Sequence, residues 1–399
     1  MSIQITNEEG FEKLINHSMS ADIFETANKV KEAVKKDTVI AYPADRSGCG
    51  NIRIINPMNY LNSTGIHNAI ISNLQIHQND HLLKYVKSVW FQRPYGISIA
   101  KDFALNGKVY KNQGVKMVID HDDMLFGKNE LQGGSKTTGV PSYNSAWETI
   151  TETAEKNHAD VLNMVDRVTV STEFLGKKIK ELGVETEIVT LQNVVPMYLW
   201  GKDKRPDITK RIQKPRVLYT GAPLHYSNKN KLKGDFDNAW FDWVIKNVQD
   251  DKIDLFVFGA EIPWFLVPFA HKVHLLKFTK YLDYPNIVRS VKANFGIAPL
   301  IENDFNKCKS DIKFLEYAAS GTPFLGSSFS DGNSPYENYN KVPQNVTPEE
   351  LQEKFEEMMV VENYNRIKNE QYRYLIDNGK YLESKQYIES LKTALFLND

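Results

Sequence analysis

Short apolar runs rich in β-branched residues alternate with amphipathic, helix-length segments along most of this chain, and this alternation constrains its fold more than any other feature. The first run, residues 38–43, is followed by a turn from Asp45 to Gly50 and by a helical pattern at 52–61. A strand, a glycine turn and a helix form the opening unit of a doubly wound parallel sheet. The chain is therefore expected to fold as an α/β protein.

The alternation recurs in two sets, separated by a polar, proline-bearing segment at 201–207. In the first set, a glycine-rich loop is predicted at 127–145, strands at 86–92, 115–119, 167–171 and 185–191, and helices at 97–105, 147–165 and 173–182. In the second set, strands are predicted at 216–220, 254–258, 273–278, 294–299 and 323–326, and helices at 236–247, 284–291, 311–319 and within 348–397. We therefore predict two Rossmann-like domains, residues 1–205 and 206–375, whose sheets face a cleft at the carboxyl ends of their strands.

The charge balance and the cysteine content exclude several classes of protein. Lys and Arg number 49 against 50 Asp and Glu, so a nucleic-acid site would have to be a local patch. Two cysteines cannot make a multi-disulfide framework, which fits a reducing cytosol. The most apolar stretch, 255–270, is interrupted by charge and proline, and the first residues lack a secretory pattern. We expect a cytoplasmic protein with no transmembrane segment.

The first candidate site is the glycine loop of Gly48, Cys49 and Gly50, between a predicted strand and a predicted helix. Glycines let the backbone approach a ligand, and the next helix offers free N–H groups to an anion; a tight turn with no ligand is the alternative. Cys49 near a helix start could be a nucleophile. Because no supporting Cys/His arrangement is evident, the pattern favours a buried small side chain instead.

The second candidate site is the run Asp120, His121, Asp122 and Asp123, directly after a predicted strand. Three carboxylates and an imidazole in this position could bind a metal, orient an acceptor hydroxyl or serve as a general base. Side chains alternate along extended backbone, so all four cannot point at one ion, and we expect no metal site here. Helix capping and solvation are the alternative.

The third candidate site, residues 306–323, is the most specific. Ser310 is placed to cap a helix whose first turns carry Lys309 and Lys313. A helix N-terminus beside two lysines suits an anion such as a diphosphate. Glu316 lies one turn further on and could accept hydrogen bonds from sugar hydroxyls. Taken alone, such lysines also fit a solvated helix face.

The string at 314–323 resembles the donor-binding segment of GT-B glycosyltransferases, in particular the retaining family known as family 4. That family carries a Glu-x7-Glu motif whose second Glu lies in a Leu-Glu-Ala-Met-Ala-Ala-Gly-Thr-Pro-like string, and Glu316 stands at this second position. The first Glu would fall at Cys308, which departs from the motif. The family's usual contact from this Glu to the sugar is therefore not expected here, and Lys309 and Ser310 become the more important donor-binding candidates.

Weaker similarities to the same family occur over most of residues 38–330, in the order in which the family has these segments. Residues 47–50 lie where the family has its first glycine loop, and residues 167–175 resemble its strand followed by Ser-x-x-Leu. Residues 218–221 are similar to the first strand of its second domain, although the Arg that follows in the family is absent.

The resemblance implies a GT-B fold, an NDP-sugar donor, expected to be a UDP-sugar, and sugar transfer with retention. It also implies that no divalent metal is required for the leaving group. The residues that would bind the donor are Lys309, Ser310, Lys313, Glu316, Gly221, Gly48 and Gly50. His121, Asp122 and Asp120 are the candidate catalytic residues, which would position or polarise the acceptor hydroxyl. A last helix within 376–399 would pack back on the first domain and help to close the cleft.

The acceptor is open between two classes. Residues 48–50 and 121–123 also resemble a glycine loop and a His-Asp-His segment of bacteriophage DNA α-glycosyltransferases, which implies hydroxymethylated pyrimidine in duplex DNA and a place in the host cytoplasm. Basic runs at 202–205, 210–211 and 229–233 could follow a phosphate backbone or be solvated loops. A cell-surface polysaccharide or lipid-linked glycan is the other acceptor. Cys308 also leaves open a non-catalytic sugar- or DNA-binding module.

Overall fold

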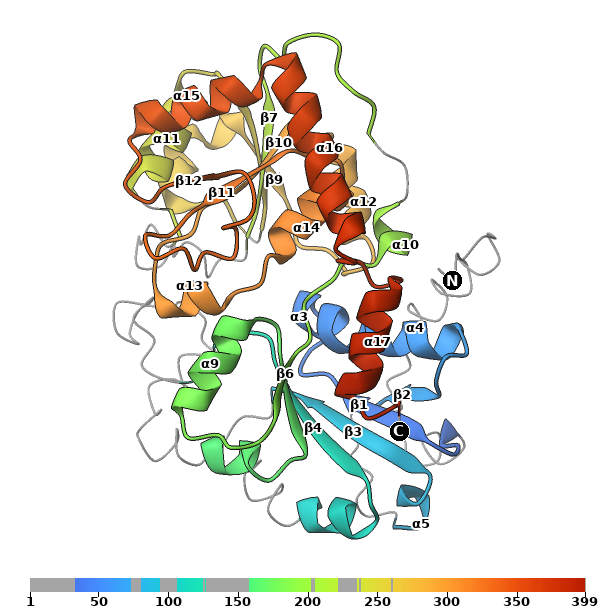
Figure 1. Cartoon of the computed structure of the whole chain (residues 1–399). Helices are drawn as coiled ribbons and strands as arrows, with labels where there is room; N and C mark the ends of the chain where they lie inside the picture. The colour runs from blue at the N-terminus through green and yellow to red at the C-terminus, as the bar shows by residue number, and fades with distance from the viewer. Residues whose placement is uncertain are drawn as a thin grey trace.

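The computed structural model describes residues 33–72, 80–93, 106–124, 126, 158–201, 205–221, 235–236, 238–259 and 261–398. Two six-stranded sheets organise these residues, and every strand pairs in parallel with its neighbours. Each sheet lies in its own domain, and the second sheet (β7–β12) is drawn above the first (β1–β6) in Figure 1. The predicted α/β class with two doubly wound sheets is confirmed.

The first sheet has the strand order β2-β1-β3-β4-β5-β6. Its strands are β1 (Thr38–Tyr42), β2 (Ala69–Ile71), β3 (Val86–Gln92), β4 (Lys116–His121), β5 (Arg167–Val170) and β6 (Ile188–Thr190). The order reverses between β1 and β3, and ligands of such sheets bind outside the carboxyl ends of the strands at that point. The loops after β1, β3 and β4 are therefore the places to look for a site.

A continuous helical run follows β1 and contains one wide turn. It consists of α3 (Gly48–Gly50), a π-helical segment (Asn51–Ile55) and α4 (Asn56–Ser63). This half also contains α5 (Asp80–Leu83), α9 (Glu173–Glu181) and α10 (Met197–Trp200), and residues 106–112 and 158–162 are helical too. Helix α9 begins where predicted, because Thr172 Oγ1 accepts a hydrogen bond from the N–H of Leu175 at 3.2 Å.

The second sheet has the order β12-β11-β10-β7-β8-β9. Its strands are β7 (Arg216–Thr220), β8 (Asp254–Phe258), β9 (Val273–Leu276), β10 (Phe295–Ala298), β11 (Phe324–Ser327) and β12 (Lys341–Val342). Counted from β7, this is the order of dinucleotide-binding Rossmann sheets, and it reverses between β7 and β10. Around it lie α11 (Asn238–Gln249), a 3-10 segment (Trp264–Lys272), α12 (Tyr284–Val291), α13 (Asp304–Cys308), α14 (Ile312–Ala319), α15 (Pro348–Met358) and α16 (Val361–Asp377).

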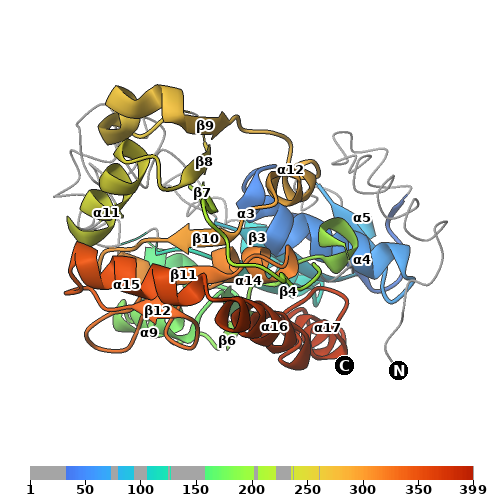
Figure 2. The ribbon, with the colours of Figure 1, turned by 90° about the horizontal axis from the view of Figure 1, so that it is seen from above.

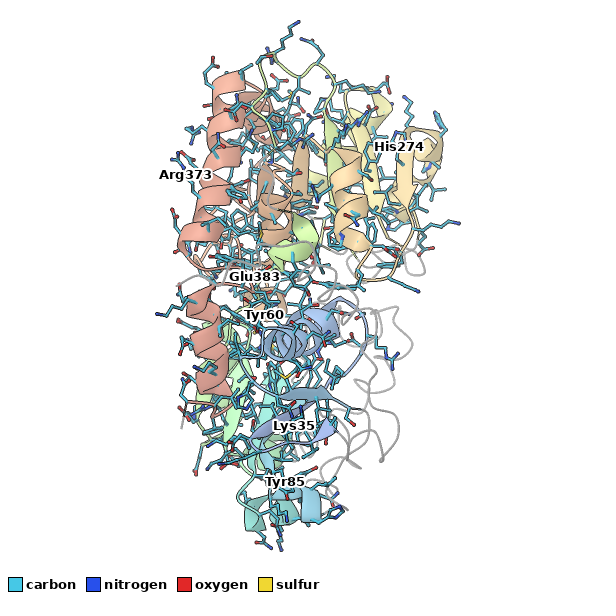
Figure 3. All side chains as sticks on the ribbon, turned by 90° about the vertical axis from the view of Figure 1, so that its right-hand side faces the viewer. Lys35, Tyr60, Tyr85, His274, Arg373 and Glu383 are labelled. Carbon is cyan, nitrogen blue, oxygen red and sulfur yellow. The ribbon has the colours of Figure 1, made fainter. Side chains whose placement is uncertain are left out.

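The chain returns to the first domain at its end. Helix α16 runs along the second domain, and α17 (Lys385–Ala394) continues beside the first sheet (Figures 1 and 2). The Phe396 ring lies 4.0 Å from the Arg167 guanidinium of β5. Between the two helices, Glu383 accepts hydrogen bonds from the first two N–H groups of α10, and Figure 3 shows it near Tyr60 where the domains meet. The domain limits 1–205, 206–375 and 376–399 stay a prediction.

One apolar cluster runs through both domains. Successive strand residues face opposite sides of a sheet, so Tyr219 and Leu218 of β7 belong to different clusters. The cluster that holds Leu218 also contains Trp90 of the first sheet and Leu391 of α17. Burial of continuous apolar surface across the junction fixes how the domains meet.

Several elements differ from those predicted. Strand β4 continues to His121 instead of ending at residue 119, and the short helix α13 was not predicted. Strands β2 and β12 were also missed, since three and two residues carry little periodicity. The predicted helix at 97–105, the loop at 127–145, most of the helix at 147–165 and the start of the chain to residue 32 lie outside the described residues. No helix in the described part of the chain has the length and hydrophobicity of a membrane span.

Candidate active site at the domain junction

The glycine loop after β1 is closed by its own aspartate. Asp45 Oδ1 accepts hydrogen bonds from the N–H of Ser47 at 2.7 Å and of Gly50 at 3.0 Å. A Cβ on Gly50 would lie 1.9 Å from the Asp45 carbonyl oxygen, so only glycine fits there, whereas Gly48 has open space around it. Because Asp45 already occupies two N–H groups, the geometry favours a tight turn. Donor binding by Gly48 and Gly50 stays a prediction.

Cys49 of this loop is half-buried, and its thiol is not activated as a nucleophile. Burial, followed by the negative charge of Asp122, raises the pKa of its thiol well above the ordinary value. The thiol is therefore protonated, which favours the small packing side chain over the nucleophile. The charges of Arg93, Asp122 and Asp123 all act on Cys49. The loop after β1 thus lies beside the ends of β3 and β4.

Asp120 is fully buried, and both of its carboxylate oxygens accept hydrogen bonds. Its carboxylate accepts from Arg53 Nε at 3.0 Å and from Thr169 Oγ1 at 2.6 Å. Arg53 comes from the π-helical segment and also donates to the Leu191 carbonyl oxygen. A buried carboxylate held in this way cannot reach a substrate. The geometry favours a structural role for Asp120, not the catalytic one proposed from the sequence, because β4 extends through this residue into the core.

His121 is also fully buried, on the opposite face of β4. Its ring centre lies 5.0 Å from that of His158. Burial, with smaller contributions from His158 and Arg93, lowers the pKa of His121 well below the ordinary value, so the imidazole is neutral. A role of His121 in polarising the acceptor hydroxyl stays a prediction. Its side chain is buried, whereas that of Asp123, two residues later, is partly exposed.

Asp122 and Asp123 share one cation. Arg93, at the end of β3, forms an ion pair with Asp122 and approaches Asp123 Oδ2 at 3.5 Å. Arg93 has a φ of 49°, a left-handed backbone uncommon for arginine, and its N–H donates to the Asp120 carbonyl oxygen at 2.9 Å. Side-chain exposure is 6% for Asp122 and 25% for Asp123. Asp123 is therefore the carboxylate best placed to meet a substrate.

Asp123 connects this edge to the second domain. Burial raises the pKa of its carboxyl, and the nearby ammonium of Lys309 opposes that rise. Lys309 Nζ lies 4.4 Å from the centre of the Phe305 ring. The charges at the end of β4 and those before α14 therefore act on each other across the junction. Both residues stand out in the sequence, but their proximity depends on how the two domains meet.

Lys313, in the first turn of α14, carries a buried ammonium. Its Nζ has no hydrogen-bond partner among the described residues and lies 5.3 Å from the centre of the Tyr219 ring of β7. Burial lowers the pKa of Lys313 to about 8, against the opposing charges of Asp235 and Glu316. An unpaired buried ammonium is costly, and an incoming anion would pair it.

Glu316 lies one turn further along α14, on the side of α12. Tyr284 donates a hydrogen bond to Glu316 Oε2 at 2.9 Å. Burial raises the pKa of Glu316 to about 7, although Tyr284 and Lys313 both favour the ionised form. The carboxyl group therefore changes protonation near neutral pH. Tyr284 is a site residue that sequence analysis missed, because it precedes a proline at the start of a separate helix.

The turn after β7 closes tightly on this group. A Cβ on Gly221 would lie 2.4 Å from the Tyr219 hydroxyl oxygen, so a side chain there would clash. The Thr220 N–H donates to the Tyr317 hydroxyl at 3.2 Å, and that hydroxyl donates to the Leu218 carbonyl oxygen at 3.0 Å. Tyr317 of α14 thus fixes the end of β7 beside Lys313, at the point where the strand order reverses.

The start of α14 corrects one prediction. Asp311, not Ser310, is the N-cap residue, and its side chain makes no capping bond. The Asp311 carboxylate accepts from the Tyr339 hydroxyl at 2.5 Å and pairs with Lys380 at 3.4 Å. Ser310 Oγ accepts instead from Asn193 Nδ2 at 2.7 Å. Asn193 belongs to the first domain and was not singled out by any local pattern.

Cys308, at the position of the family's first Glu, is fully buried between the domains. Its Sγ lies 3.8 Å from Met124 Sδ, and its carbonyl oxygen accepts from Thr172 Oγ1 at 2.9 Å. A carboxylate here would lose its water, and the negative charges of Asp123 and Asp304 would act against it. The described residues contain no cluster of His, Cys, Asp and Glu suited to a metal ion.

No protein-family model matches this sequence, and no curated protein does. Among solved structures, a glycosyltransferase from Rickettsia africae ESF-5 covers 90% of this chain and 99% of its own, with a TM-score of 0.57 and 12% identity. An α,α-trehalose 6-phosphate synthase from Burkholderia multivorans covers 91% of this chain and 98% of its own, with a TM-score of 0.50 and 7% identity. At these identities the likeness shows the fold, which is GT-B as predicted.

Proposed function

We propose that this chain is an enzyme, a glycosyltransferase that moves a sugar from a nucleotide-sugar donor to an acceptor hydroxyl. The observation that carries this proposal is the buried Nζ of Lys313, which lacks a hydrogen-bond partner among the described residues. It lies at the carboxyl end of a Rossmann-ordered sheet, where such folds bind nucleotides. A diphosphate would supply the missing negative charge.

The donor's diphosphate would lie against Lys313 and Lys309. When the bond between the anomeric carbon and the diphosphate breaks, negative charge grows on the leaving oxygen, and the two ammonium groups stabilise it. Glu316, when ionised, would accept hydrogen bonds from hydroxyl groups of the sugar. A UDP-sugar is the proposed donor.

The reaction proposed is transfer with retention. The acceptor oxygen bonds to the anomeric carbon on the face from which the diphosphate departs, and the hydroxyl proton passes to the leaving phosphate oxygen. Atoms and charge then balance without a covalent intermediate on the protein. Asp123, which is partly exposed beside Lys309, is placed to orient that hydroxyl.

The acceptor proposed is a hydroxymethylated pyrimidine in duplex DNA. The support is that both segments resembling phage DNA α-glycosyltransferases adjoin each other, since the charges of Asp122 and Asp123 act on Cys49 of the glycine loop. A polysaccharide or lipid-linked glycan is the competing acceptor, and the experiment below separates them.

The direct test measures nucleoside diphosphate released from UDP-glucose and GDP-glucose with three acceptors. These are a hydroxymethylated duplex, the same duplex unmodified, and a glycan extract. Transfer to the first at a rate that falls steeply with salt supports DNA, because phosphate contacts release counterions. Transfer to the extract alone moves the acceptor to glycans. Nucleotide binding without turnover favours the non-catalytic module, and absence of both contradicts the proposal.

The matched variants are Lys309→Ala and Lys354→Ala. Lys354 is a surface lysine of α15 paired with Glu357 at 3.1 Å, far in sequence from the proposed site. Lys309→Ala should lower turnover, since it removes one of the two charges on the diphosphate. Lys354→Ala should leave it unchanged.

A further inference from the structure

Asn193 joins two side chains that belong to different domains. It lies between β6 and α10 and is 7% exposed. Its Oδ1 accepts a hydrogen bond from Arg53 Nη1 at 2.9 Å, and its Nδ2 donates to Ser310 Oγ at 2.7 Å. Both polar atoms of its amide are therefore used, one toward each domain.

Arg53 is itself immobilised. Asp120 accepts from it through both carboxylate oxygens, at 3.0 Å from Nε and 2.5 Å from Nη2. Arg53 and Asp120 are 1% and 0% exposed, so neither can move without breaking a buried ion pair. The amide of Asn193 thus has a fixed anchor in the first sheet.

Ser310 directly precedes the N-cap of α14, and Lys313 lies in the first turn of that helix. We propose that Asn193 is a positioning residue: it holds Ser310 in a fixed place relative to Arg53, and so sets the adjacent Lys309 and the start of α14 relative to the first domain's Asp123. This inference rests on the proposed function, because it concerns how the donor's ammonium contacts meet the acceptor's carboxylate. A displacement of about 1 Å between reacting groups can lower a rate about 100-fold.

A second hydrogen bond also joins the helical run after β1 to the second domain. Asn56 Nδ2 donates to the Tyr281 hydroxyl of the second domain at 3.2 Å. Burial raises the pKa of the Tyr281 phenol, and the charge of the nearby Glu316 adds to that rise. Arg53 and Asn56 are therefore both connected to the second domain, Arg53 through Asn193 and Ser310, and Asn56 through Tyr281.

The test compares Asn193→Ala, Asn193→Asp and Ser310→Ala in the full chain. Two quantities are measured: kcat of sugar transfer and the Kd of UDP alone. UDP alone is held by groups of the second domain, so Asn193→Ala should change its Kd by less than about threefold while kcat falls about tenfold or more. Asn193→Asp should restore kcat to within about threefold, because its carboxylate accepts from Arg53 and from the Ser310 hydroxyl.

The control is Asn247→Ala, since Asn247 is 3% exposed and donates to the Trp243 carbonyl oxygen within one domain. It should lower thermal stability without separating kcat from Kd. Should Asn193→Ala fail to fold, Ser310→Ala removes the same cross-domain bond and must lower kcat. The inference is overturned if both variants keep kcat within about twofold of the wild type, or if Asn193→Asp is as slow as Asn193→Ala. A wild type that neither binds UDP nor transfers sugar would contradict the proposed function instead.

Discussion

Lys313 Nζ lies 5.3 Å from the centre of the Tyr219 ring and finds no hydrogen-bond partner among the described residues. The ring offers a weak cation–π attraction, which does not replace a hydrogen bond to a buried charge. The protein therefore keeps an ammonium in an unfavourable place, at the carboxyl end of β7. An unpaired buried charge of this kind is expected at a position where the residue serves binding and not stability.

Lys313→Met should make the protein more stable. Methionine has a similar shape and removes the buried charge, so the free energy of unfolding should rise by about 1–3 kcal/mol at pH 7. Urea denaturation of both proteins measures the change, with Lys354→Ala as the surface control. A loss of stability would mean that the ammonium has a structural partner.

The stability of the wild type should depend on pH through Glu316. Burial raises the pKa of the folded protein's Glu316 to about 7 from 4.5. Between these two values the folded state holds a proton that the unfolded state has released, so this residue's contribution falls as pH rises from 4.5 to 7. Glu316→Gln should gain about 1–3 kcal/mol relative to the wild type across that interval. Denaturation curves at pH 5 and pH 8 test this, and an equal difference at both would contradict it.

Asp120→Ala should destabilise the protein severely. It leaves the Arg53 guanidinium buried without its carboxylate, which costs about 3–5 kcal/mol. Glu370→Ala breaks an exposed pair with Arg366 and should cost about 1 kcal/mol or less. The comparison by thermal or urea unfolding separates a structural Asp120 from a catalytic one. An Asp120→Ala protein as stable as the wild type but inactive would support the predicted catalytic role instead.

Cys308→Glu should not improve the enzyme, although it restores the family's motif. The side chain is fully buried against Met124, so a carboxylate there would lose its water, and the negative charges of Asp123 and Asp304 would act against it. We expect stability to fall by about 3 kcal/mol or more and transfer to decrease, whereas Cys308→Ala should keep transfer near the wild-type rate. Urea unfolding and turnover of the two variants give the answer. A gain in transfer for Cys308→Glu would show that the pocket rearranges to admit the family's glutamate.

Local pattern predicted the elements that carry function but not the contacts between them. The strands at 86–92 and 216–220 and the helix at 284–291 have their predicted limits, because long apolar or amphipathic runs are read directly from periodicity. The same reasoning brought Lys313 and Glu316 to one helix. It could not find Arg53 as the partner of Asp120, because these residues are 67 positions apart. The bond from Asn193 to Ser310 spans 117 positions and depends on how the domains meet.

The placement of Asp120 shows what the local sequence pattern could not predict there. Four polar residues in a row look like a loop, and the strand was predicted to end before them. Pairing with β5 extends β4 through His121, so alternation turns Asp120 and His121 into the core. Tertiary pairing overrides composition in this case, and only Asp122 and Asp123 remain at the strand's end.

Calorimetric titration of UDP into the wild type and into Lys313→Met tests the central claim most directly. We predict that UDP binds the wild type and that the variant binds it about 10–100-fold more weakly, because one charge-assisted hydrogen bond is lost. The variant should be the more stable of the two, so misfolding cannot explain its weaker binding. Equal affinity of the two proteins for UDP, or no binding to the wild type, would contradict the assignment of Lys313 to the donor's diphosphate.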